Sequence, residues 1–123
     1  MNLPSMQHSF SVSVKGDDTN QLYEGRCVYK RPNHRTKLEI MQNFERLVGP
    51  EKDKLPETMS LLMYMISFIK HTLIECPDWL KESNYGEEGY DTSVIEEIFI
   101  NCQKFEEEYV KKVFPDGKSD GTK

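Results

Sequence analysis

The side chains that could support catalysis or bind a metal in this chain are three histidines and three cysteines. They are His8, His34, His71, Cys27, Cys76 and Cys102. No cysteines form a Cys-x-x-Cys pair, and no histidine stands at ligand spacing from a cysteine or at a telling spacing from an acid. The chain also has no phosphate-binding loop, nucleophile elbow or dinucleotide fingerprint. We therefore expect a protein that is not an enzyme, with no metal or cofactor, whose cysteines pack as small apolar residues.

Two clusters of acidic residues could bind a cation or could simply face solvent. The first contains Glu87, Glu88 and Asp91, and the second is the run 106–108. The first lacks the alternating spacing and the distal glutamate of a calcium-binding loop. We expect it to be a solvated loop, and the second to be the solvent-facing side of a helix.

The charge distribution along the chain is more informative. Residues 26–37 contain no acid and five cations, whereas residues 75–109 carry eleven acids against Lys81 and Lys104. The five cations are Arg26, Lys30, Arg31, Arg35 and Lys37. They could solvate a hairpin end and a helix start, bind an acidic protein or the acidic half of a second copy, or bind nucleic acid. The net charge of −5 argues against nucleic acid as the main partner.

The first third of the chain predicts a β-hairpin. In residues 9–15, Phe10, Val12 and Val14 alternate with polar residues, which is the period of a half-buried strand. A turn cluster at 16–21 precedes a second strand at 22–30. Because two strands are marginally stable alone, we expect them to pack on helices or pair with another chain, which favours a homo-oligomer.

The rest of the chain predicts three main helices. The first follows an N-cap at Asn33, carries an apolar stripe and ends at Gly49. Its stripe comprises Leu38, Met41, Phe44, Leu47 and Val48. The second, over 56–75, is apolar nearly all round and should be the most buried. The third begins at a capping box, Ser93 to Glu96, and its stripe comprises Val94, Ile98, Cys102, Phe105, Tyr109 and Val113.

These elements indicate an α+β fold in one domain of residues 9–114, with a flexible arm at 1–8 and a disordered tail at 115–123. The segment 77–91 connects the second and third helices and holds the only tryptophan, Trp79. We expect Trp79 to anchor this segment on the helices. The most apolar run, 59–69, is too short to span a bilayer, and we see no targeting segment, so we expect a soluble cytoplasmic protein without membrane contact.

A set of residues spread over roughly residues 10–110 resembles a known family. The set comprises Val12, Val14, Gly16, Tyr23, Gly25, His34, Arg35, Leu47, Val48, Gly49, the run Pro77-Asp78-Trp79-Leu80-Lys81-Glu82-Ser83, and then Gly86, Asp91, Val94 and Ile95. It is similar to the tail assembly chaperone-like proteins of tailed bacteriophages, with Leu80 where the family has a second tryptophan. The resemblance implies a non-catalytic protein of the host cytoplasm.

The same resemblance implies partners. Such a chaperone binds the long helical tape-measure protein, keeps it soluble, helps to recruit tail-tube subunits, and is absent from the mature virion. The alternative is a small structural virion protein, a tail-completion or head–tail joining component, in which the hairpin adds a strand to a neighbouring sheet.

Overall fold

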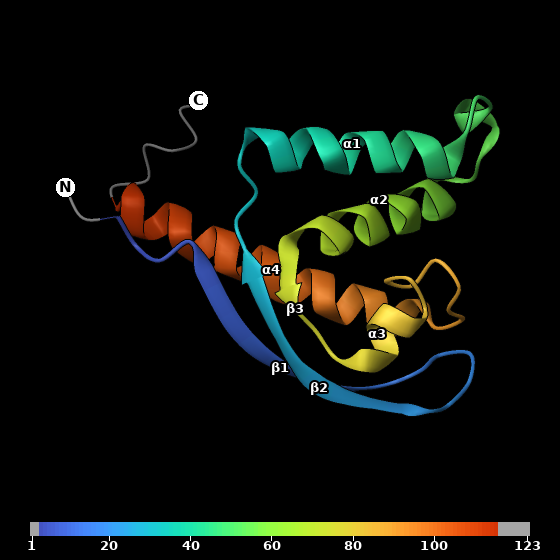
Figure 1. Ribbon diagram of the computed structural model, residues 1–123, viewed down its shortest axis with the longest axis horizontal. Helices are drawn as coiled ribbons and strands as arrows, with labels where there is room; N and C mark the ends of the chain where they lie inside the picture. The colour runs from blue at the N-terminus through green and yellow to red at the C-terminus, as the bar shows by residue number, and fades with distance from the viewer. Residues whose placement is uncertain (1–2, 116–123) are drawn as a thin grey trace.

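A computed structural model describes residues 3–115 of the chain. The elements follow in the order β1 (Gln7–Lys15), β2 (Leu22–Lys30), α1 (His34–Val48), a 3₁₀ turn (Lys52–Lys54), α2 (Glu57–Thr72), β3 (Leu73–Glu75), α3 (Asp78–Glu82) and α4 (Thr92–Val113). The strands form an antiparallel sheet in the order β1-β2-β3. Helix α4 packs on β1, α2 packs on α4, and α1 packs on α2 (Figure 1). The fold is therefore α+β, as the sequence predicts.

The predicted hairpin is confirmed. β1 pairs with β2 in a continuous register from Gln7 opposite Lys30 to Lys15 opposite Leu22. The alternation of β1 buries Phe10 and Val12 in the core. The strand begins at Gln7, so the predicted arm of residues 1–8 is too long. His8 lies within this strand, and its ring stacks on that of Phe105 in α4, with the ring centroids 4.9 Å apart.

Helix α1 begins and ends where the sequence predicts. The Asn33 side chain accepts a hydrogen bond from the Thr36 backbone amide at 2.9 Å, which makes Asn33 the N-cap. The helix ends at Gly49, whose φ of 74° is favoured by glycine. The predicted stripe is wrong in its first half. The buried residues of α1 are Ile40, Asn43 and Val48.

The expected second helix is shorter than predicted, because it ends at Thr72 and a third strand follows. Leu73 lies opposite Tyr29 of β2, and Glu75 lies opposite Val28. The backbone groups of this segment therefore pair with the sheet instead of continuing the helix. Residues Met65–Ile69 of α2 are all buried, so the predicted central position of this helix is correct.

Helix α4 contributes buried residues to the core along most of its length. Its predicted stripe from Val94 to Tyr109 is buried against the sheet. The predicted capping box is wrong, because the helix starts at Thr92 and the Ser93 hydroxyl instead donates to the Lys15 carbonyl oxygen at 3.0 Å. The predicted disordered tail, apart from Pro115, lies outside the described residues.

Candidate functional site

The structure separates the five predicted cations into two groups. Arg26, on β2, lies 3.4 Å from Glu75 of β3, and both side chains are largely exposed. Arg31 also pairs inside the fold. The remaining three, Lys30, Arg35 and Lys37, are exposed, and they form no ion pair within residues 3–115. The sequence could not separate these three cations from the two that pair with acids inside the chain, and the role of all five in binding stays a prediction.

Arg31 belongs to a polar network that joins the end of β2 to α4. Its Nε donates to both carboxylate oxygens of Glu106, at 3.1 and 3.0 Å, and its guanidinium lies 3.7 Å from the ring centroid of Tyr109. The hydroxyl of Tyr29, a fully buried residue, donates to Glu106 at 2.5 Å. Burial, followed by this hydrogen bond, raises the pKa of Tyr29 far above its ordinary value. Glu106 is thus a partly buried acceptor, so the prediction that the run 106–108 faces solvent is wrong for Glu106 and confirmed for Glu107 and Glu108.

The expected loop of Glu87, Glu88 and Asp91 is also only partly solvated. Glu87 accepts from Arg46 of α1 at 2.8 Å and lies 3.3 Å from Lys70 of α2, with its side chain 13% exposed. It therefore ties the connecting segment to both helices, although the sequence predicts a wet surface. Glu88 is exposed, as predicted.

Asp91 is buried and holds the loop of the β-hairpin. Its carboxylate accepts from the backbone amides of Asp18 and Thr19, at 2.7 and 2.8 Å, from the Thr19 hydroxyl at 2.6 Å, and from the Tyr23 hydroxyl at 2.9 Å. Burial raises the pKa of this carboxyl, but the four hydrogen bonds outweigh burial and lower the pKa to about 2. A Cβ on Gly16 would lie 2.3 Å from the Asp91 carboxyl carbon, so the turn needs glycine there to admit the carboxylate.

Trp79 is only partly buried, and its indole contacts the first residues of β2, next to the hairpin loop. Its Nε1 donates to the Glu24 carbonyl oxygen at 3.0 Å, and its ring lies 5.0 Å from the Tyr23 ring, tilted by 59°. Leu80 is 1% exposed, so the next residue is the more deeply buried of the two. Leu80 is part of the core and Trp79 packs against it, and the role of Trp79 as the anchor stays a prediction.

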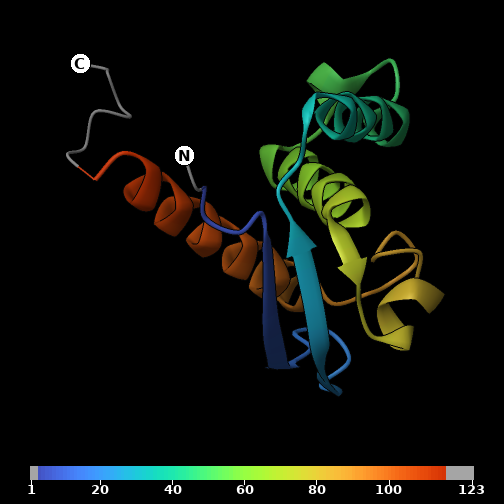
Figure 2. The ribbon, with the colours of Figure 1, turned by 60° about the vertical axis from the view of Figure 1, so that its left-hand side comes forward.

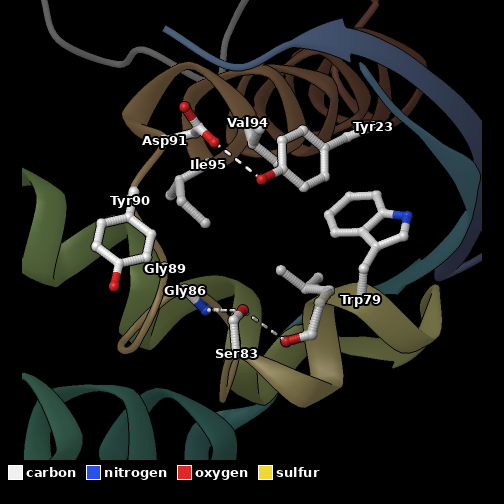
Figure 3. A pocket seen from close by; sticks show the side chains of 10 residues that line it. Tyr23, Trp79, Ser83, Gly86, Gly89, Tyr90, Asp91, Val94 and Ile95 are labelled. Atoms are coloured by element: carbon white, nitrogen blue, oxygen red, sulfur yellow. Dashed lines mark hydrogen bonds between the residues drawn. The ribbon is translucent and has the colours of Figure 1, made fainter. Parts of the chain in front are cut away.

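A small cavity lies between the hairpin, α3 and the start of α4 (Figure 3). Its volume is about 90 Å³. The lining residues are Tyr23, Trp79, Leu80, Ser83, Gly86, Gly89, Tyr90, Asp91, Val94 and Ile95. Figure 3 shows Trp79 and Tyr23 on one side of the opening and Tyr90 on the other. Tyr90 is 75% exposed, so the cavity has an aromatic mouth that solvent reaches.

The second candidate surface is the outer side of α1. Leu38 is 58% exposed and Met41 is 46% exposed, and they follow Arg35 and Lys37 along the same helix. Helix α1 packs mainly on α2 and lies outermost in both ribbon views (Figure 2). Its exposed side therefore combines apolar contact area with positive charge. Both residues belong to the apolar stripe that the sequence predicts for this helix, yet they face solvent.

The histidines and cysteines do not assemble into a site. His71 lies 4.0 Å from Glu39, and burial lowers the pKa of its imidazole. Cys27 and Cys102 are buried, and burial raises the pKa of the Cys27 thiol to about 12. Within residues 3–115, no three His, Cys, Asp or Glu side chains are placed to hold a metal ion. In the same part of the chain, no helix is long and apolar enough to cross a membrane.

Comparison of the chain with protein-family models, with curated proteins and with solved structures finds no match.

Proposed function

We propose that this protein is a non-catalytic binding protein that acts as an assembly chaperone, and that it docks a partner on the outer side of α1. The observation that carries the proposal is the exposure of Leu38 and Met41 beside Arg35 and Lys37. Large exposed apolar side chains next to charges mark protein-interaction surfaces, and flexible methionine suits partners of varied shape. The positive end of the α1 dipole adds to the two cations, so the complementary partner is an acidic amphipathic helix.

The resemblance to phage tail assembly chaperones points to the tape-measure protein as this partner. A tape-measure protein is a long helical chain with exposed apolar stripes, which is the kind of surface that α1 complements. We propose that the protein binds unassembled tape-measure protein in the host cytoplasm, keeps it soluble, helps to recruit tail-tube subunits, and is absent from the finished particle.

The test is co-expression with the tape-measure protein from the same genome. We expect the two proteins to co-purify, and the tape-measure protein to precipitate without the chaperone. Leu38→Glu/Met41→Glu should abolish co-purification, whereas Ile100→Glu, at an equally exposed apolar position of α4, should not. Co-purification that survives the double change would show that α1 is not the docking surface.

A structural virion protein is the alternative, and one observation favours it. β1 is a nine-residue strand at the edge of the sheet, and no strand within residues 3–115 pairs with its outer side. An open edge of this length could accept a strand from a neighbouring subunit. A component of this kind stays in purified particles, whereas a chaperone is lost, so mass spectrometry of the particles separates the two.

A further inference from the structure

The cavity beneath Trp79 has the size of a site for one side chain. Its volume of about 90 Å³ is well below the roughly 300–1,000 Å³ of sites for cofactors and drug-sized ligands. It exceeds the roughly 30 Å³ that one water molecule occupies in the liquid. Leu80, Val94 and Ile95 contribute apolar side chains to its lining, and Tyr23, Trp79 and Tyr90 contribute aromatic rings. A slender side chain whose tip can stack on aromatic rings fits this combination.

The charge around the cavity indicates that the side chain is cationic. The two segments that form its mouth, 16–24 and 81–91, carry seven acids against one cation, Lys81. The acids are Asp17, Asp18, Glu24, Glu82, Glu87, Glu88 and Asp91. Of these, Glu87 is neutralised by Arg46 and Lys70, and Asp91 is occupied by its four hydrogen bonds. The rest supply a negative field, and a guanidinium gains further from contact with aromatic rings.

The chain itself offers such a side chain at its opposite end. Arg35 and Lys37 are exposed in the first turns of α1, close in sequence to Lys30 at the end of β2. β2 carries Tyr23 of the cavity near its start, so about 23 Å of strand separate the cavity from Lys30. Figure 1 shows the start of α1 beyond the end of β2, whereas α3 lies near the hairpin loop at the other end of that strand. The two surfaces of one copy therefore cannot meet each other.

We propose that the cavity of one copy receives the Arg35 side chain of a second copy, while Lys37 and Lys30 face the acids of its mouth. The guanidinium, at the tip of the Arg35 side chain, enters first and lies against the rings of Tyr23 and Trp79, and the aliphatic stem follows past Tyr90 at the mouth. The contact joins two different surfaces, so it repeats head to tail and produces rings or open chains. This inference goes beyond the proposed function, and because both use Arg35 and Lys37, the second copy and the partner compete for the start of α1.

Two variants disable one surface each without unfolding the protein. Arg35→Glu/Lys37→Glu places acids in the first turns of α1, where the helix dipole favours them. Tyr90→Lys replaces a side chain that is 75% exposed and puts a repelling cation in the mouth. The control, Lys111→Glu/Lys112→Glu, makes the same change of net charge as the first variant at the far end of α4.

Sedimentation measures the association at about 0.05 M and 0.5 M salt, because screening weakens contacts between exposed charges. We expect the wild-type protein and the control to associate at low salt and to dissociate at high salt, and each variant to be monomeric. An equimolar mixture of the two variants should form a dimer and stop there, since one intact cavity meets one intact Arg35. The single tryptophan, Trp79, should change its fluorescence on mixing.

Three results would overturn the proposal. The first is a wild-type protein that stays monomeric at low salt and high concentration. The second is association that survives both variants, which would place the interface elsewhere. The third is a mixture of the variants that stays monomeric although the wild-type protein associates.

Discussion

Replacement of Trp79 by alanine tests whether the connecting segment depends on its indole ring. The change removes three contributions. Burial of about 100 Å² of apolar surface is worth about 2.5 kcal/mol, the hydrogen bond from Nε1 to the Glu24 carbonyl about 1 kcal/mol, and the contact with the Tyr23 ring about 1 kcal/mol. We expect Trp79→Ala to lower the free energy of unfolding by about 3–5 kcal/mol, within the range for aromatic truncation.

The assay is equilibrium unfolding in urea followed by circular dichroism, which does not need the tryptophan. Trp79→Phe keeps a ring but loses the indole N–H, so it should cost about 1 kcal/mol. Tyr90→Ala is the matched control in the same cavity, and its ring is 75% exposed, so it should change stability by less than about 0.5 kcal/mol. A Trp79→Ala protein that loses no more than this control would show that the segment is anchored by Leu80 alone.

Three further changes test the contacts between elements. The free energy of unfolding should fall as the pH drops from about 4 toward 2, because the Asp91 pKa of about 2 lies below the value of about 3.9 in the unfolded chain. Melts in acid should show that Asp91→Asn flattens this loss. Tyr29→Phe leaves the Glu106 carboxylate one donor short and should cost about 1.5–3 kcal/mol by urea melt; no loss would mean the hydroxyl bond contributes nothing. Gly25→Ala would place a Cβ 2.2 Å from the Pro77 ring, so we expect a loss of about 1–3 kcal/mol, and an unchanged melting curve would mean that Pro77 moves freely.

The hairpin and the two ends of α1 could be predicted because their signals are local. The alternation at Phe10 and Val12 sets one face of β1, and the Asn33 cap and Gly49 set the two ends of α1. In each case a few neighbouring residues determine the backbone geometry. The third strand has no such signal, because Leu73–Glu75 is as apolar as the helix before it and pairs with β2 only after folding.

The buried side of α1 shows where periodicity alone gives the wrong answer. Leu38 and Met41 fit a helical stripe, but the helix buries Ile40 and Asn43 instead. The Asn43 amide donates to the hydroxyl of Ser67 on α2 at 2.8 Å, so a buried polar pair fixes the orientation of the helix. Apolar side chains are thereby left on the surface, and this displacement is the reason that α1 is a candidate for docking.

Ion pairs and hydrogen bonds within the fold determine which charged side chains remain available to a partner. Arg31 and Glu106 are 75 residues apart, and Asp91 is 72 residues from Thr19, so no short pattern reveals either contact. These internal contacts use up some of the cations in 26–37 and some of the acids in 75–109. Lys30, Arg35 and Lys37 remain beyond the end of β2, and the acids around the cavity remain near its start. This separation of the two signs of charge is what the head-to-tail association proposed above requires, and it would give that association its direction.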